Sequence, residues 1–426
     1  MQKRYPQYKD SGVEWLGQVP IHWELKRLKY LDKTVMGQSP ESDDCNKEGM
    51  GIPFLQGNAD FGHLNPEPSV WCAHPNKVAE KDDILLSVRA PVGAVNIADQ
   101  VYGIGRGLCA VRPVRSHKRY AYYRTLCLPE ELNRVATGST YTAIAVDQVN
   151  NVVIANPDQG EQKFISNYLD QKTAQIDDLI AKKQRMIELL KEERAAVINQ
   201  AVTKGLDPNA EMKDSGIEWA PRIPKKWHAR PVKAFFDVQL GKMLQPESGV
   251  LGDQLTPYLK ALHVNWGDVA TSDLPEMWAS FSDLNQYGVQ AGDLLVCEGG
   301  EVGRAGIILE APQGCIIQNA LHRVRAREGF DVRFFMYVLY AVAEAGWFSI
   351  LCNKATIAHL TREKLVALQI PAPVGEDQKK IADYLDKKTA QIDGQVVREQ
   401  RSIEFLKEYR AALISEAVTG KIDIRN

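Results

Sequence analysis

Acidic and basic residues that could form a nuclease site stand together near the middle of the chain. Pro157-Asp158 is followed by Glu161-Gln-Lys163, the residue types of a PD…ExK metal-dependent nuclease. Such a site needs its acids on neighbouring strands, and the gap here is too short for that arrangement. The second half of the chain has Pro373 followed by valine at the corresponding point. The segment is therefore interpreted as structural, and no nuclease site is predicted.

Other motifs with catalytic potential are incomplete. Asn156-Pro157 begins like the Asn-Pro-Pro-Tyr loop of amino-methyltransferases, but Asp158 and Gln159 break the pattern. Gly103-Ile-Gly-Arg-Gly107 is interpreted as a turn before a strand, and no Walker sequence is found that could cradle a triphosphate. The seven cysteines are scattered and the eight histidines are dispersed, so neither a disulfide framework nor a metal site is predicted. The sequence predicts a chain without catalysis of its own.

Composition is that of a soluble globular protein, with 44% hydrophobic and 25% charged residues among 426. No apolar run could span a bilayer and the first ten residues lack a signal core, so a cytoplasmic protein without membrane contact is expected. The net charge of −2 gives no global attraction to nucleic acid, so any DNA binding must use local patches. One candidate is the acid-free stretch between Val101 and Pro129, although its charges could equally be balanced by acids elsewhere. Its basic residues are Arg106, Arg112, Arg115, Lys118, Arg119 and Arg124.

The chain contains an internal duplication, which is the sequence signature of a repeated architecture. The segment Lys9-Asp-Ser-Gly-Val-Glu-Trp15 recurs as Lys213-Asp-Ser-Gly-Ile-Glu-Trp219. Residues 165–207 align without gaps on residues 381–423, with more than half of the positions identical. The centre of this match is Leu169-Asp-Gln-Lys-Thr-Ala-Gln-Ile-Asp177, which recurs from Leu385 to Asp393.

Between these segments the two halves diverge, yet faint correspondences predict the same strands in each. Asp83–Ser87 resembles Asp293–Cys297, and a Val-Gly pair follows both runs. Leu108–Arg112 and Leu321–Arg325 are also predicted strands, each followed by a helix, near residues 120–127 and 333–345. A short strand and a proline end each variable region, at 152–157 and 368–371. Each half is thus predicted to be a mixed α/β module that varies, followed by a helix that barely changes.

The two long repeated segments have the period of amphipathic helices. Their apolar positions are Ile165, Leu169, Ile176, Leu179, Ile187, Leu190, Val197 and Ala201 in the first, and Ile381, Leu385, Ile392, Val396, Ile403, Leu406, Leu413 and Ala417 in the second. Neither stripe could be hidden by one small module, so the helices are predicted to pack against each other. The predicted fold is α+β, with two mixed α/β modules joined by two long antiparallel helices in a coiled coil, pseudo-two-fold symmetric and circular.

Together these segments resemble the specificity (S) subunits of type I restriction-modification systems. The resemblance rests on the paired Lys-Asp-Ser-Gly segments, the paired Leu-Asp-x-Lys-Thr-Ala-Gln-Ile-Asp helices, and the run from Gly292 to Gly303 with its counterpart from Asp83 to Gly93. It implies target recognition domains at 1–157 and 208–373, and conserved helices at 158–207 and 374–426. It also implies that the chain reads an asymmetric, bipartite site in double-stranded DNA and docks two methyltransferase subunits and restriction subunits. S-adenosylmethionine, ATP and Mg²⁺ would belong to those partners, with no cofactor in this chain.

Base reading needs hydrogen-bonding side chains at groove edges, so the loops that flank the module strands are the predicted DNA contacts. In the first module these are Gln56, Asn58, Ser87, Arg89, Arg106 and the loop residues Ser139, Thr140 and Tyr141. In the second they are Lys260, His263, Asn265, Glu298, Arg304, Gln318, Asn319 and the loop residues Lys354 and Thr356. The alternative is a coiled-coil scaffold whose modules bind proteins rather than DNA. A self-sufficient methylase or nuclease is disfavoured because the motifs are missing.

Overall fold

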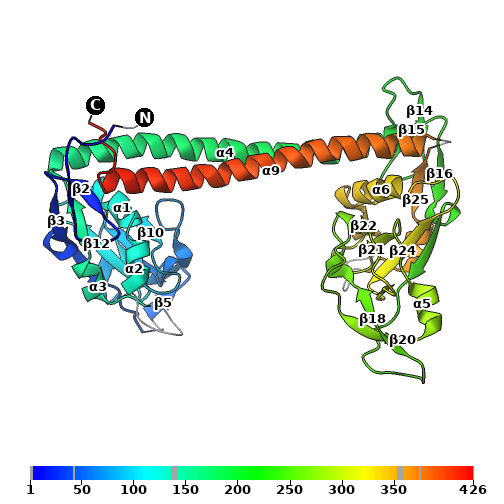
Figure 1. Ribbon diagram of the computed structural model, residues 1–426, viewed down its shortest axis with the longest axis horizontal. Helices are drawn as coiled ribbons and strands as arrows, with labels where there is room; N and C mark the ends of the chain where they lie inside the picture. Colours follow the sequence, from blue (N-terminus) through cyan, green and yellow to red (C-terminus); the bar gives the residue numbers. More distant parts are fainter. Residues whose placement is uncertain (1–2, 42–43, 136–142, 353–358, 374–375, 426) are drawn as a thin grey trace. The chain divides into compact units, whose positions relative to one another are not determined.

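The computed structural model describes residues 3–41, 44–135, 143–352, 359–373 and 376–425. The chain divides into two compact units: unit 1 is Met1–Gln184 with Arg401–Asn426, and unit 2 is Arg185–Gln400. Each unit holds one mixed α/β module and a stretch of both long helices, α4 (Gln159–Lys204) and α9 (Asp377–Val418) (Figure 1). The predicted fold class is therefore confirmed. Within the described ranges, no helix is both long and apolar enough to cross a membrane.

The module of unit 1 is built on two sheets. An antiparallel sheet has the order β10-β9-β12-β4, with strands Val95–Ile97, Ile84–Ser87, Leu108–Pro113 and Asp32–Met36. A second sheet has the order β5-β7-β6-β11-β8, with strands Cys45–Asn46, Val70–Cys72, Ile52–Leu55, Tyr102–Ile104 and Val78–Ala79. Two-stranded ladders join β1 (Tyr8–Asp10) to β2 (Gln18–Pro20) and β3 (Glu24–Arg27) to β13 (Val153–Asn156). The helical segments are η1 (Leu28–Tyr30), η3 (Asn58–Asp60), α1 (Lys118–Leu126), α2 (Pro129–Val135) and α3 (Val146–Asn151).

The module of unit 2 repeats this plan with different lengths. Its larger sheet has the order β17-β24-β21-β22-β19, with strands Phe236–Leu240, Leu321–Ala326, Leu294–Cys297, Ala305–Ile307 and Gly267–Asp268. The strands β20 (Glu276–Ala279), β18 (Gln254–Leu259) and β23 (Ile316–Ile317) form a second sheet. Ladders join β14 (Met212–Asp214) to β15 (Arg222–Pro224) and β16 (His228–Pro231) to β25 (Gln369–Ala372). The helical segments are η4 (Val232–Ala234), η5 (Ala261–His263), α5 (Phe281–Tyr287), α6 (Val332–Glu344), α7 (Trp347–Leu351) and α8 (Arg362–Ala367).

The faint correspondences between the two halves mark equivalent strands with equivalent partners. Strand β9 pairs antiparallel with β12, and β21 pairs in the same way with β24. An ion pair ties each of these ladders together: Arg112 Nη2 lies 2.8 Å from Asp83, and Arg325 Nε lies 2.6 Å from Asp293. Both aspartates are buried, so each ion pair satisfies a carboxylate that would otherwise be costly to bury.

The residues of the nuclease-like motif shape the start of α4. The Asp158 side chain accepts a hydrogen bond from the Glu161 backbone N–H at 2.9 Å, which is the role of a helix N-cap. Glu161 is buried and binds side chains of the N-terminal segment. At the far end of the helix, Gly205 has a φ of +76° and stops the helix in the left-handed conformation that glycine favours.

Most of the predicted apolar stripe packs as expected, with one correction. Ile165, Leu169 and Ile176 are buried in the core of unit 1, and Ile381 and Leu385 are buried in that of unit 2. Leu179, however, is 43% exposed, while its neighbour Ile180 packs against the core. Both residues fit the helical spacing from Ile176, at steps of three and four, and Ile180 is the one that aligns with the apolar Val396 in the repeat.

The two long helices run antiparallel, and the same ion pair repeats beside each module. In unit 1, Arg410 of α9 lies 2.9 Å from Asp177 of α4. In unit 2, Arg194 of α4 lies 3.0 Å from Asp393 of α9. The C-terminal end of α9 meets the N-terminal segment in unit 1, where the Asp423 backbone N–H donates to the Lys3 carbonyl oxygen at 2.8 Å. The N-terminal and C-terminal segments thus lie side by side in unit 1, as the predicted circular arrangement requires (Figure 1).

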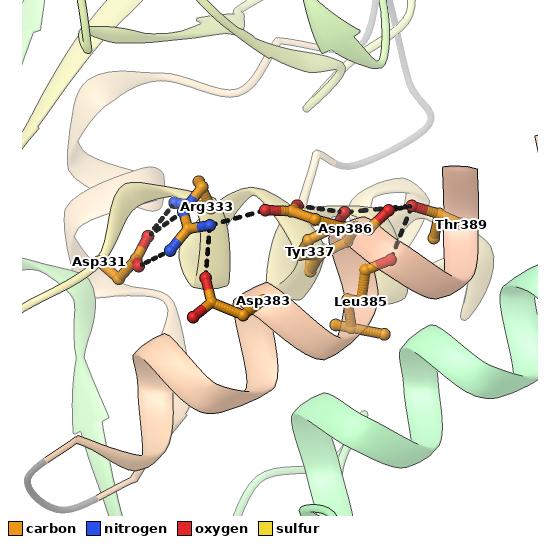
Figure 2. A network of polar contacts seen from close by, with 7 residues as sticks. All are labelled: Asp331, Arg333, Tyr337, Asp383, Leu385, Asp386 and Thr389. Atoms are coloured by element: carbon orange, nitrogen blue, oxygen red, sulfur yellow. Dashed lines mark hydrogen bonds and ion pairs between the residues drawn. The ribbon is translucent and has the colours of Figure 1, made fainter. Parts of the chain in front are cut away.

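Each module is held on its long helix by a polar joint that also repeats. In unit 2, Arg333 and Tyr337 of α6 contact Asp386 of α9, with Nη1 and the hydroxyl at 2.7 and 2.8 Å from its carboxylate (Figure 2). The Tyr337 hydroxyl also lies 3.3 Å from the Thr389 hydroxyl. Arg333 additionally binds Asp331 and Asp383, and these carboxylates raise the pKa of its guanidinium.

In unit 1 the joint uses the same residue types at the same spacing. Arg119 Nε and the Tyr123 hydroxyl of α1 donate to Asp170 of α4 at 3.0 and 2.7 Å. The Tyr123 hydroxyl lies 3.2 Å from the Thr173 hydroxyl. Burial is the main cause that raises the pKa of Tyr123 to about 12, so the phenol stays protonated and remains a donor at neutral pH. The repeated helix motif therefore supplies an aspartate and a threonine to an internal contact.

The joint predicts a local loss of stability on Asp386→Ala. Removing the shared acceptor leaves the buried Tyr337 hydroxyl without its carboxylate partner, which should cost about 2 kcal/mol. The more exposed Asp383, which binds only Arg333, offers a matched control, and Asp383→Ala should cost less than about 0.5 kcal/mol. Hydrogen exchange of the α6 amides measures both. Equal protection in the two variants would show that the joint contributes nothing.

A buried tryptophan follows the second strand of each N-terminal hairpin, and the two copies differ in one contact. In unit 1 the Trp23 indole N–H donates to Glu161 at 2.9 Å. In unit 2 the counterpart of Glu161 is Asp377, and within the described residues the Trp227 indole N–H is buried without a hydrogen-bond partner. Aspartate is one methylene shorter than glutamate, and Asp377 instead pairs with Lys226 at 3.0 Å.

The difference predicts that Asp377→Glu stabilises unit 2. A glutamate can reach the buried indole N–H, and satisfying that donor should raise the free energy of unfolding by about 1 kcal/mol. Urea denaturation followed by tryptophan fluorescence measures the change. The reciprocal Glu161→Asp should destabilise unit 1, and a stabilising effect of that reciprocal change would contradict the explanation.

Candidate nucleic-acid interface

In both modules the second sheet contains a pair of parallel strands, and several predicted DNA contacts follow the carboxyl ends of those strands. Strand β6 pairs parallel with β11, and β18 pairs parallel with β23. Gln56 and Arg106 follow the first pair, whereas Lys260, Gln318 and Asn319 follow the second. The same framework thus presents different side chains at the same place.

In unit 1 these side chains converge on Ser39. The Ser39 hydroxyl accepts from Gln56 Nε2 at 3.0 Å and from Arg106 Nε at 3.1 Å. Asn76 Nδ2 donates to the Ser39 carbonyl oxygen at 3.1 Å. Gln56 and Arg106 are exposed, so this Ser39 cluster offers an amide and a guanidinium, the two groups that bind adenine and guanine edges in the major groove. Ser39 and Asn76 were not predicted, because no local motif marks them.

The glycine run Gly103–Gly107 allows these strand ends to meet. A Cβ atom at Gly105 would lie 2.5 Å from Gln56 Oε1, and one at Gly107 would lie 2.6 Å from the Gln56 carbonyl oxygen. The run is therefore a close-approach segment beside Gln56, in agreement with its interpretation as a turn.

The equivalent edge of unit 2 carries half-buried polar groups. Asn319 N–H donates to the Lys242 carbonyl oxygen at 2.8 Å, and Gln318 N–H donates to the carbonyl oxygen of Leu259, the residue before Lys260. Lys242 Nζ lies 3.0 Å from Asp283. The Glu298 backbone N–H donates to the carbonyl oxygen of Ala320, the residue after Asn319, at 2.9 Å, and burial raises the pKa of the Glu298 carboxyl. This edge therefore differs from the Ser39 cluster in side chains rather than in backbone path.

Three of the predicted contacts are corrected, because the structure uses their side chains inside the modules. Ser87 is buried, and its hydroxyl donates to the Pro91 carbonyl oxygen. His263 is buried, and its Nδ1 accepts from the Lys260 backbone N–H at 3.1 Å. Arg304 binds Glu301 and the Ala261 carbonyl oxygen at 2.8 and 2.9 Å. Polar residues beside a turn were expected to face solvent, but here they hold the turns together.

The other predicted contacts lie at separate places in the modules. Arg89 and Asn265 are exposed, and Asn58 is half-buried at the start of η3. Ser139, Thr140 and Tyr141 in the first module, and Lys354 and Thr356 in the second, lie outside the described residues.

The predicted basic patch between Val101 and Pro129 is wrong as a continuous surface. Four of its six basic residues are paired with carboxylates elsewhere in unit 1, namely Arg112 with Asp83, Lys118 with Asp82, Arg119 with Asp170 and Arg124 with Asp32. The Arg124–Asp32 pair is buried, and nothing in the sequence near either residue indicates that the two are paired. Most of the basic residues in this stretch are therefore balanced by acids elsewhere in the sequence, which was the alternative interpretation.

A basic groove of unit 1 was not predicted from the sequence. It has a volume of about 520 Å³ and lies around η1 and the start of β4, with Lys29, Lys33 and Arg115 on its walls together with Tyr30 and Asn150. Its cations come from two segments about 80 residues apart in sequence, so no local charge run could reveal it. In the part of the chain that the structure describes, no group of three His, Cys, Asp or Glu side chains could hold a metal ion.

Comparison with known proteins gives one consistent family. A family model described as type I restriction modification DNA specificity domain matches residues 20–189 and 269–400. Among curated relatives from Methanocaldococcus jannaschii, the putative type I restriction enzyme MjaX specificity subunit is 37% identical over 202 residues, 46% of this chain and 46% of that protein. The type I restriction enzyme MjaVIII specificity subunit is 25% identical over 432 residues, 96% of this chain and 95% of that protein. The match to the first relative thus spans less than half of its length.

Two solved structures share the fold. A chain from a type I R-M system whose complex assembly and conformational transition were studied gives a TM-score of 0.72 at 16% identity, covering 94% of this chain and 98% of that one. The HsdS subunit from Thermoanaerobacter tengcongensis gives a TM-score of 0.56 at 17% identity, covering 97% of this chain and 100% of that one.

The buried Arg124 and the exposed Arg106 should differ greatly in how much each contributes to the stability of unit 1. Arg124→Ala leaves Asp32 buried and unpaired, and should destabilise unit 1 by about 3–5 kcal/mol. Arg106→Ala removes an exposed side chain and should change stability by less than about 0.5 kcal/mol. Thermal and urea denaturation of the full chain compare the two. A severe loss in Arg106→Ala would assign that arginine to the scaffold rather than to the Ser39 cluster.

Proposed function

Since the chain belongs to the family of type I restriction-modification DNA specificity domains, we propose that it reads an asymmetric, two-part DNA site, one part with each module. Family membership makes it a specificity subunit rather than a catalytic chain. The observation that carries the proposal is the pair of equivalent sheet edges with unlike side chains. Because the Ser39 cluster and the Lys260, Gln318 and Asn319 edge share a backbone framework, their difference lies in what they can recognise.

The Ser39 cluster is suited to base edges. The Gln56 amide can bind adenine N6 and N7, and the Arg106 guanidinium can bind guanine O6 and N7. The hydrogen bonds to Ser39 restrict both side chains before DNA arrives, which lowers the entropic cost of ordering them on binding. In unit 2, Gln318 and Asn319 are the amides at the corresponding edge, with Lys260 beside them.

The basic groove of unit 1 is suited to the DNA backbone. Lys29, Lys33 and Arg115 place positive charge on one surface of a chain whose net charge is −2. Such contacts to phosphates position a protein on DNA without carrying sequence information. We assign this groove to phosphate binding, and the sheet edge to base reading.

The long helices are proposed to dock two methyltransferase subunits and, through them, restriction subunits. Large apolar side chains are exposed on these helices in both units, which is the mark of a docking surface. They include Phe164, Phe405 and Tyr409 in unit 1, and Met186, Leu189 and Val397 in unit 2. S-adenosylmethionine, ATP and Mg²⁺ are assigned to those partners, and the assembly to the cytoplasm.

Base reading by each edge is tested by changing one amide in each unit. Gln56→Ala should relax the sequence requirement at one or two positions of one half-site, and Asn319→Ala should do so in the other half-site. Each change should cost about 1–3 kcal/mol of discrimination. Methylation of a randomised DNA library by the chain with its methyltransferase partner, followed by sequencing, gives the motif of each variant. Relaxation of the same half-site by both changes would refute the assignment.

Phosphate binding by the groove is tested through the dependence of DNA affinity on salt. The double change Lys29→Ala with Lys33→Ala should weaken binding to all sequences alike and reduce the salt slope by about 2. Lys225→Ala, which removes an exposed lysine paired with Glu211 in unit 2, is the matched control and should leave the slope unchanged. An unchanged slope in the double variant would exclude the groove from the DNA interface.

A further inference from the structure

One site at the start of a long helix is filled in unit 1 by the chain's own N-terminal segment. The Tyr5 hydroxyl donates to Glu161 Oε1 at 2.7 Å, while the Trp23 indole donates to the other oxygen of that carboxylate. The Tyr5 ring packs edge-on to Trp23 at 5.8 Å between centroids, and the Arg425 guanidinium lies 4.7 Å above it. Tyr5 is buried, so the site holds a complete tyrosine side chain.

The counterpart of this site in unit 2 is a cavity. The register of the N-terminal repeat aligns Tyr5 with Asn209, which is exposed and carries no ring. A cavity of about 150 Å³ opens beside it, with Gly205, Leu206, Ala210, Pro224 and Ile381 on its apolar side and Trp227 and Asp377 among its walls. These last two are the counterparts of Trp23 and Glu161, the residues that contact Tyr5 in unit 1.

The polar groups of the cavity are incompletely used. The Trp227 indole N–H is buried and, among the described residues, has no hydrogen-bond partner. The Asp377 carboxylate has one oxygen 3.0 Å from Lys226 Nζ. A hydroxyl group that enters here can donate a hydrogen bond to the Asp377 carboxylate, as the Tyr5 hydroxyl does to Glu161 in unit 1. That hydrogen bond favours an occupant with a hydroxyl over an apolar one.

The rim of the cavity differs in charge from that of the filled site. Lys204, Lys226 and Lys380 lie on it, at positions where unit 1 has Gly420, His22 and Phe164. Asp207 and Asp377 also line the cavity, and Asp377 pairs with Lys226, so the three lysines exceed the acids by one charge. This excess favours an occupant with negative charge around its ring. The N-terminal segment of a second copy of this chain carries Lys3 and Arg4 next to Tyr5, so its charge is unfavourable for this rim.

We propose that the cavity of unit 2 binds a tyrosine side chain presented by an acidic segment of a partner protein. Tyr5 in unit 1 shows how a tyrosine fits the equivalent walls, and the lysine rim selects the acidic flanks. The site lies beside the first turn of α9 and uses no residue of the proposed DNA interface, so it is independent of the proposed function.

The test measures binding of short fluorescent peptides to the full chain by anisotropy. A Glu-Glu-Tyr-Glu-Glu peptide should bind about tenfold more tightly than its phenylalanine analogue, which lacks the hydroxyl that donates to Asp377. A Lys-Lys-Tyr-Lys-Lys peptide should bind more weakly than both. Equal binding of the tyrosine and phenylalanine peptides, or of the acidic and basic peptides, would overturn the proposal, as would no binding at all.

Variants of the cavity locate the peptide. Ala210→Phe places a ring in the space and should reduce affinity for the acidic tyrosine peptide about tenfold or more, since the peptide's own ring loses its burial. Glu211→Ala, beside the cavity but outside it, is the control. Unchanged affinity in Ala210→Phe, with the fold intact by circular dichroism, would place the peptide elsewhere and reject the site.

Discussion

A carboxylate on each long helix determines how the adjoining module sits on that helix. Asp170 and Asp386 each accept from an arginine and a tyrosine four residues apart on the module's own helix. The tyrosine hydroxyl has two neighbours in both cases, the aspartate and a threonine, so the angle between the helices is restricted at a single point. The rest of each module can change in sequence provided that this contact is kept. That constraint explains why Leu-Asp-x-Lys-Thr-Ala is repeated almost unchanged while the sheets it supports have diverged.

The sequence predicted what is periodic or local, and missed what joins distant segments. The long helices, their antiparallel pairing and the equivalent strands follow from apolar spacing and from the gapless repeat. The joint could not be predicted, because Arg119 and Tyr123 stand about 50 residues before Asp170 in a region where the halves no longer align. The basic patch failed for the same reason: Arg124 finds Asp32 at a separation of 92 residues, and no charge count along the chain reveals that pair.

The sequence predicted part of the Ser39 cluster but not all of its members. Loops that follow buried strands are natural places for recognition, and Gln56, Arg106, Gln318 and Asn319 were predicted as DNA contacts on that argument. Ser39 and Asn76 were missed, because their role depends on the close approach of residues 37–39 to Gly105, which the lack of a side chain at Gly37 permits. Ser87 and His263 were selected by the same argument and proved to be internal, since a polar side chain beside a turn can satisfy the turn's own backbone instead of facing solvent.

The two copies of the buried tryptophan site differ in what covers them. Both chain ends lie in unit 1, where Tyr5 and Arg425 cover the indole and carboxylate of Trp23 and Glu161. Unit 2 has no chain end at the equivalent place, because residues 205–211 run continuously from α4 into the next hairpin. In unit 2, Asp377 stands in place of Glu161, and Lys204, Lys226 and Lys380 stand in place of Gly420, His22 and Phe164. The uncovered copy of the site therefore has a shorter carboxylate and a different set of charges from the copy that Tyr5 fills.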